Sequence, residues 1–259
     1  MIVFAFVGAT TSIAQLFLWT LGFNDSPILR LSLLVIIPMG IVIAVLKSIT
    51  PTSLAFRHPT ALASINIMVG DLFTASNSTE VVTVNRYFDT DPEWAPPGSL
   101  ITQLAERRYG GDLSQLRDLI LSQLPGTPDR KQPVGQIVRA LTPLSDTLLL
   151  ALSDRHQETR STVVVNDIWM ALGELWRFAR HENLATLRVP IIGAGFARSQ
   201  VGQVPLLVLL LTSYVTSAME MPICPLEIIL WPDATDVGLL ELSKAYCETL
   251  GFRVIEAHE

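Results

Sequence analysis

The chain has 259 residues, a formal net charge of −6 and an apolar fraction of 49%. The negative charge argues against a nucleic-acid partner, because it would repel phosphates. Two cysteines without histidines in ligand spacing argue against a metal site or a disulfide framework. The mean hydropathy of +0.42 is high for a soluble protein, which predicts a membrane segment beside one globular domain. An anionic ligand must then be bound locally, by backbone amides rather than by a basic surface.

Two apolar segments at the N-terminus predict a transmembrane helical hairpin over residues 1–48. Residues 1–24 and 31–46 contain no Lys, Arg, Asp or Glu. Each segment is close to the ~20 residues that cross a bilayer, and a short polar link separates them. Arg30 lies near one interface, where its long side chain can reach the headgroups. The globular domain is expected over residues 60–259.

The few charges near these segments predict the topology of the hairpin. A cleavable signal peptide is the alternative for the first segment, but no basic residue precedes Arg30, and such peptides begin with basic residues. Lys47, Arg57 and His58 follow the second segment. By the positive-inside rule the globular domain then lies in the cytoplasm, and the chain is a multi-pass protein of the inner membrane.

Small residues recur at four-residue spacing in both apolar segments. They are Gly8 and Ser12 in the first and Gly40, Ala44 and Ser48 in the second. Such spacing lets helices approach closely in lipid, where packing drives their association, so it predicts a homo-oligomer. The alternative is that these residues pack against one another within a single hairpin.

Strands and helices alternate along the rest of the chain. Strands are expected at 65–71, 81–90, 147–152, 187–192, 226–230 and 252–255. Helices are expected to begin at the N-caps Ser99 and Asp112, and further helices at 162–180, 201–218 and from about 236 to Gly251. The apolar spacing places Trp169 and Trp176 on the buried face of one helix. This alternation predicts an α/β domain of three layers, with a mixed, largely parallel sheet between helices.

The apolar run at 204–211 has two interpretations, a third membrane span or a helix buried against the sheet. It is too short for a span, and Pro205 and Ser213 interrupt or follow it. A buried helix is therefore expected.

Three strand ends carry residues of the kind that bind ligands. Gly70 and Asp71 end the first strand, Asn85 lies towards the end of the second, and VPIIGAGFAR at 189–198 leads from a strand through a glycine turn. Glycines allow close backbone approach, and a following helix N-terminus favours an anion. The alternative is that the two glycines of this turn are there for steric reasons only.

These motifs resemble those of the macro domain, an α/β fold that binds ADP-ribose. They are most similar to the macro domain of membrane-anchored effectors in Thoeris anti-phage systems. The shared patterns are V-N-x-Y-F-D-T at 84–90, Ser99-Leu100, and V-P-x-x-G-x-G-x-x-R at 189–198. The resemblance covers residues 64–258 and has the three patterns in the right order.

The resemblance implies roles for individual residues. Asp71 would accept a hydrogen bond from the adenine amino group, Asn85 would contact the distal ribose, and the glycine loop would hold the diphosphate. The implied ligand-binding residues are Asp71, Leu72, Asn85, Tyr87, Phe88, Asp89, Ser99, Leu100, Gly193, Ala194, Gly195, Phe196, Ala197 and Arg198.

The resemblance also implies a function. The ligand would be ADP-ribose or an amino-acid conjugate such as histidine-ADP-ribose, made by a partner enzyme with a TIR domain, and its binding would cause membrane disruption during phage infection. Additional groups of a conjugate would be read by residues 86–89. No separate cofactor is implied.

The sequence favours binding over catalysis. In macro domains that hydrolyse ADP-ribosyl bonds the matching Asn is soon followed by a glycine run, whereas here the first glycine after Asn85 is Gly98. No Ser-His-Asp or HExxH pattern is present, so no catalytic residue is expected. The alternatives are a membrane-tethered ADP-ribosyl hydrolase and a scaffold that the hairpin only tethers.

Overall fold

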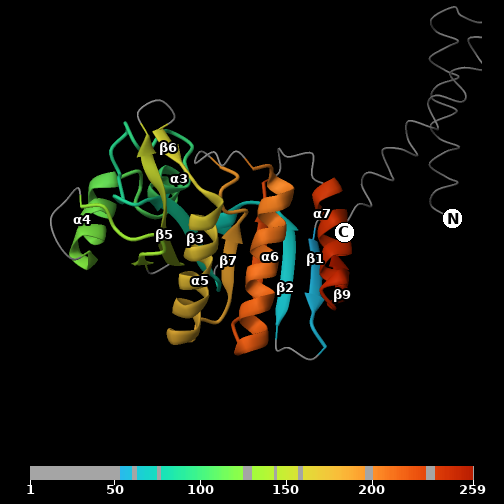
Figure 1. Ribbon diagram of the computed structural model, residues 1–259. Helices are drawn as coiled ribbons and strands as arrows, with labels where there is room; N and C mark the ends of the chain where they lie inside the picture. Colours follow the sequence, from blue (N-terminus) through green and yellow to red (C-terminus); the bar gives the residue numbers. More distant parts are fainter. Residues whose placement is uncertain are drawn as a thin grey trace, which may run out of the picture. The chain divides into compact units, whose positions relative to one another are not determined.

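The computed structural model describes residues 53–59, 63–74, 77–124, 130–142, 145–156, 160–195, 201–231 and 237–258 (Figure 1). They belong to one compact unit, Thr52–His258. The predicted hairpin at 1–48 lies outside the described residues, and so do three predicted site residues, Phe196, Ala197 and Arg198.

The described residues form a nine-stranded sheet in the order β4-β5-β3-β7-β8-β2-β1-β9, with β6 paired to β5 beside this path. The strands, in chain order, are β1 Ser53–Arg57, β2 Ser64–Val69, β3 Thr79–Asn85, β4 Ile137–Thr142, β5 Ser145–His156, β6 Arg160–Thr162, β7 Leu187–Pro190, β8 Leu226–Leu230 and β9 Arg253–His258. The central strands β5, β3, β7, β8 and β2 are parallel. β4, β6, β1 and β9 pair antiparallel at the flanks, which confirms the predicted mixed sheet.

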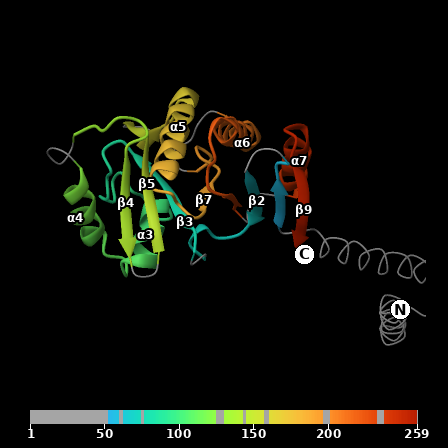
Figure 2. The same cartoon turned by 90° about the horizontal axis from the view of Figure 1, so that it is seen from below.

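Helices cover both faces of the sheet (Figure 2). On one face lie α5 (Val165–His181), α6 (Gln203–Glu220) and α7 (Val237–Thr249); on the other lie α3 (Leu100–Arg108), α4 (Leu113–Gln123) and the short 3₁₀ helix η2 (Leu72–Thr74). Strand side chains alternate between the two cores: Leu148 and Leu150 of β5 pack on the α5 side, Leu149 and Ala151 on the α3 side. The predicted three-layer α/β/α architecture is confirmed.

Several predicted helix ends are confirmed by their hydrogen bonds. The Ser99 hydroxyl accepts from the Thr102 amide at 3.4 Å at the start of α3, and Asp112 Oδ1 accepts from the Ser114 amide at 2.9 Å at the start of α4. Gly251 follows α7 with φ of 86°, a left-handed conformation that suits glycine. Local sequence signals therefore located these boundaries correctly.

Three strands were not predicted. β1 lies between the predicted hairpin and the predicted start of the domain at residue 60, β4 follows a Pro/Gly-rich stretch, and β6 ends at residue 162, where a helix was expected to begin. Each is short and lies at or beside the edge of the sheet. Its strand conformation depends on pairing with the neighbouring strand, and it has no long apolar run that would predict a strand from the sequence. The compact unit consequently begins before residue 60.

The prediction that Trp169 is buried beside Trp176 is wrong. Trp176 is 1% exposed, but Trp169 is 43% exposed. At about 100° per residue, Trp169 projects ~20° beyond Trp176, past the margin of the face that packs on the sheet. Sequence periodicity does not distinguish a buried residue from an exposed one at the edge of the buried face of a helix.

Within the described residues, α6 is the one helix long and apolar enough to cross a membrane, by length and composition only. It packs against the sheet, with Leu206, Leu210 and Tyr214 among its buried residues. The expectation that 204–211 belongs to a buried helix is confirmed.

Candidate functional site

The carboxyl ends of the parallel strands bring the predicted motifs to one edge of the sheet. Asp71 follows β2, Asn85 ends β3, residues 191–195 follow β7, and Trp231 follows β8. Because the spatial order is β3-β7-β8-β2, the glycine loop lies between Asn85 on one side and Asp71 with Trp231 on the other. Ligands of open α/β sheets bind at such strand ends.

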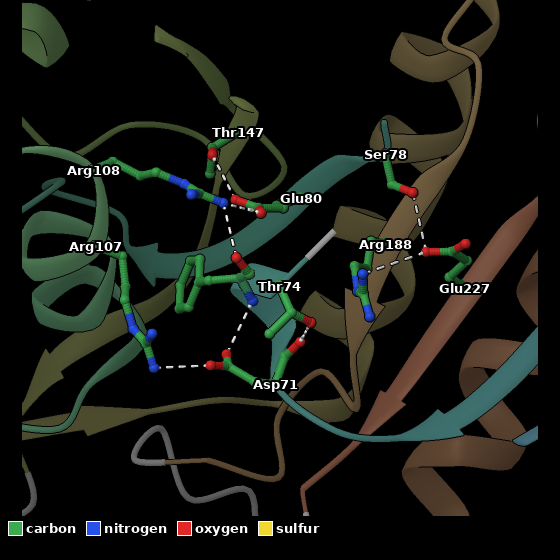
Figure 3. Close-up of polar contacts among 10 residues, drawn as sticks. Asp71, Thr74, Ser78, Glu80, Arg107, Arg108, Thr147, Arg188 and Glu227 are labelled. Carbon is green, nitrogen blue, oxygen red and sulfur yellow. Dashed lines mark hydrogen bonds and ion pairs between the residues drawn. The ribbon is translucent and has the colours of Figure 1, made fainter. Parts of the chain in front are cut away.

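Asp71 is held at the start of η2 (Figure 3). Its Oδ1 accepts from the Phe73 amide at 3.0 Å, and its Oδ2 accepts from Arg107 Nη2 at 2.9 Å. An ionised carboxylate has about four acceptor sites, so capacity remains for another donor. The neighbouring Leu72 is 2% exposed in the α3-side core, which leaves only its backbone for a ligand contact.

The peptide groups of Phe73 are fixed on both sides. Asp71 binds its amide, and Arg108 Nη2 donates to its carbonyl oxygen at 3.0 Å. The same Arg108 nitrogen donates to Glu80 Oε1 at 2.6 Å, and the Thr147 hydroxyl donates to Glu80 Oε2 at 3.1 Å (Figure 3). Burial raises the pKa of Glu80, while Arg108 opposes that rise. This support for η2 was missed, because a single Glu in an apolar strand does not reveal its partner.

A buried polar row crosses the strands that carry the site. Glu80, Arg188 and Glu227 occupy paired positions on β3, β7 and β8. Arg188 is 6% exposed, its Nη1 lies 3.9 Å from Glu227 Oε2, and the Ser78 hydroxyl donates to that oxygen at 3.0 Å (Figure 3). These contacts link β7 to β8 and tie the residue just before β3 to β8.

Asn85 organises the loop that follows β3. Its Oδ1 accepts from the amides of Tyr87 at 3.1 Å and Asp89 at 3.2 Å, and its Nδ2 donates to Asp89 Oδ2 at 2.8 Å. Asn85 and Asp89 are each 8% exposed. The amide therefore has one orientation, because turning it over would set Nδ2 against two backbone donors.

Asp89 is also paired with Arg155, from the end of β5. Arg155 Nε donates to Asp89 Oδ2 at 2.7 Å and Nη2 donates to Oδ1, a bidentate arrangement. The guanidinium lies over the Tyr87 ring, 4.0 Å from its centroid, and 5.4 Å from the centroid of Trp94. Neither Arg155 nor Trp94 was among the predicted site residues, since neither lies in a motif.

Three other predicted residues have structural roles in the core or at a helix end. Phe88 is 3% exposed in the α3-side core, and its φ of 53° is unusual for a bulky side chain. Ser99 is the N-cap of α3, and Leu100 packs partly against the same core.

The two glycines of the loop after β7 serve different purposes. Gly193 has φ of 86°, and a Cβ there would lie 2.9 Å from Ile168 Cδ1. At Gly195 a Cβ would meet none of the described residues within 4 Å. Ala194 donates its amide to the Ile191 carbonyl at 3.2 Å, closing the turn. The left-handed backbone expected of such a turn is thus observed at Gly193.

The sequence model of a family described as Thoeris protein ThsA, Macro domain, matches residues 65–230. The chain belongs to this macro-domain family. The match spans Asp71, Asn85 and the glycine loop, and it confirms the resemblance found in the sequence. A search among curated proteins found no match.

Solved macrodomains share the fold. The Oceanobacillus iheyensis macrodomain with ADP has a TM-score of 0.51 at 15% identity, over 76% of this chain and 98% of that one. A mutant of the same macrodomain reaches 0.56 at 12% identity over the same shares. Thermosipho africanus DarTG in complex with ADP-ribose has a TM-score of 0.51 at 16% identity, over 70% of this chain and 45% of that one. At these identities the likeness establishes the macro-domain fold.

Proposed function

We propose that this macro domain is a sensor that binds ADP-ribose or an ADP-ribose conjugate without consuming it. The order of the strand ends carries the proposal: Asp71 and Trp231 on one side, the glycine loop in the centre and Asn85 on the other. This order fits a ligand with a purine at one end, a diphosphate in the middle and a second ribose at the other end.

The adenine and the diphosphate of the ligand both find suitable chemistry. Asp71 accepts from the adenine amino group, and the 50% exposed Trp231 offers an aromatic face for stacking. The exposed backbone at Gly195 and the N-terminus of α6, which begins without a side-chain cap at Gly202, suit the diphosphate. The solved structures of similar fold that contain ADP or ADP-ribose support this assignment.

For the whole chain we propose an effector of anti-phage defence in the inner membrane. Residues 1–48 anchor it, the macro domain faces the cytoplasm, and a partner TIR-domain enzyme makes the ligand. Ligand binding shifts a homo-oligomer of the hairpins towards its active state, and the active state disrupts the membrane. To shift the ratio of active to inactive assemblies from 1:99 to 99:1, the ligand must bind the active state ~10⁴-fold more tightly, a difference of about 5.5 kcal/mol. Several subunits coupled by about 1–3 kcal/mol each supply it.

Replacing Asp71 with Ala is expected to weaken ADP-ribose binding by roughly 10- to 150-fold, because one charge-assisted hydrogen bond to adenine is lost. Ribose 5-phosphate, which has no adenine, should bind Asp71→Ala as it binds the wild type. Calorimetry on the purified full chain measures both. Equal losses for the two ligands would show that Asp71 does not contact adenine.

Replacing Gly8 and Gly40 together with Leu is expected to abolish ADP-ribose-triggered dye release from vesicles containing the full chain. The larger side chains would keep the hairpins apart in lipid, while ADP-ribose affinity stays unchanged. Release that persists in this variant would rule out assembly through the small-residue faces. A wild-type chain that binds ADP-ribose and never releases dye would favour a tethered scaffold.

A further inference from the structure

The loop after β3 contains features that cost free energy. Asp89 carries a side chain that is 5% exposed and bound as an ion pair, and buried ion pairs add little net stability. Phe88, one residue earlier, adopts a left-handed backbone with φ of 53°. Strain of this kind persists where the surroundings over-determine it, and it gathers at functional sites.

The hydrogen bonds of the loop form a chain that ends at Asn85. The Arg155 guanidinium fixes both oxygens of Asp89, and Asp89 Oδ2 accepts from Asn85 Nδ2 at 2.8 Å. The Tyr87 ring lies against the face of the same guanidinium. The second hydrogen of Asn85 Nδ2 therefore points in a fixed direction.

The balance of charge between Asp89 and Arg155 also favours an anionic ligand. An unpaired Asp89 carboxylate close to the strand ends would repel a diphosphate. The bidentate pairing with Arg155, whose side chain is 25% exposed, neutralises it. The Asp89 carboxylate can then orient the Asn85 amide without repelling the diphosphate of the ligand.

We infer that Asp89 and Arg155 are positioning residues that orient Asn85 toward the distal ribose, and that they make the site prefer ADP-ribose over ADP. The inference rests on the proposed function. An amide fixed before binding needs no reorganisation when the ribose arrives, so its hydrogen bond contributes fully to affinity. ADP lacks the second ribose, so its affinity is independent of the contacts among Asn85, Asp89 and Arg155.

The test compares ADP-ribose and ADP by calorimetry on the full chain. In Asp89→Asn and Arg155→Lys, ADP-ribose affinity should fall by roughly 10-fold or more, while ADP affinity changes by less than about 2-fold. Tyr87→Leu, a change at a partly exposed ring, should weaken ADP-ribose in the same selective way and to a smaller extent. Thermal unfolding monitored by circular dichroism confirms that each variant is folded.

Arg139→Lys is the matched control. Arg139 binds Asp146 in the same bidentate manner, with Nε–Oδ1 at 2.9 Å and Nη2–Oδ2 at 2.8 Å. Asp146 lies at the amino end of β5, far along the strand from Arg155. If the loss of a bidentate arginine–aspartate pair acted only through the fold, Arg139→Lys would weaken binding too. We expect its affinities for ADP-ribose and for ADP to stay at wild-type values.

The outcomes separate this inference from the proposed function. Equal losses for ADP and ADP-ribose in Asp89→Asn, or wild-type ADP-ribose affinity in all three variants, overturns the positioning role. A wild-type chain that binds the two nucleotides equally overturns it as well, while leaving nucleotide binding in place. A wild-type chain that binds neither nucleotide contradicts the proposed function itself.

Discussion

Replacing Gly195 with Glu is expected to abolish ADP-ribose binding and to leave the fold intact. Within the part of the chain that the structure describes, a Cβ at Gly195 would have no neighbour within 4 Å, and the residue is exposed, so the domain accommodates a side chain there. The Glu carboxylate, however, would occupy the space over the loop and repel the diphosphate. We expect affinity to fall by at least ~100-fold, which corresponds to about 2.8 kcal/mol. Calorimetry gives the affinity, and thermal unfolding tests the fold.

Two substitutions serve as controls for Gly195→Glu. Gly195→Ala adds only a methyl group, which contacts none of the residues that the structure describes, and should keep most of the affinity and all of the stability. Gly193→Ala should instead lower stability, because φ is 86° and the new Cβ would press on Ile168 Cδ1 at 2.9 Å. A folded Gly195→Glu chain with normal ADP-ribose affinity would show that the ligand does not cross this loop.

Replacing Arg108 with Met is expected to lower the free energy of unfolding by about 3–5 kcal/mol at pH 7, because it leaves a buried carboxylate without its partner. Glu80 is 0% exposed, and Arg108 donates to it at 2.6 Å. The Phe73 carbonyl oxygen would lose its donor as well. Urea unfolding of the full chain, followed by the fluorescence of its tryptophans, measures the loss.

The loss in Arg108→Met should depend on pH with a definite sign. Burial already raises the pKa of Glu80 in the folded chain, and removing Arg108 removes a group that lowers it. A carboxyl group whose pKa is raised on folding stabilises the fold below its unfolded pKa and loses that contribution as pH rises. The deficit should therefore shrink as pH falls toward the ordinary range for Glu. Adding Glu80→Gln should recover most of it at pH 7, and a deficit that ignores both changes would contradict the ion-pair explanation.

The sequence predicted the motif-bearing strands because each is an apolar run that ends in a polar or glycine residue. Asp71, Asn85 and the glycine loop were placed at strand ends, and the parallel order of the strands brings those ends to one edge. Ser99 and Asp112 were correct as caps because capping depends on a few neighbouring residues. Local signals were sufficient for these features.

Pairing between distant side chains could not be predicted in the same way. Arg155 meets Asp89 across 66 residues, and Glu80 meets Arg108 across 28. Nothing local in the sequence distinguishes these residues from other charged residues in strands or helices. Likewise Phe88 lies within a motif but packs in the α3-side core, with a left-handed backbone that nothing in the sequence reveals for a bulky residue.

Titration of the full wild-type chain with ADP-ribose, followed by chromatography of the recovered nucleotide, tests the central claim most directly. The proposed sensor should give saturable binding with one ligand per macro domain, and the ADP-ribose should be recovered unchanged after prolonged incubation. The absence of saturable binding would contradict the assignment of the strand-end site. Binding accompanied by consumption of the nucleotide would contradict the assignment of the chain as a sensor rather than an enzyme.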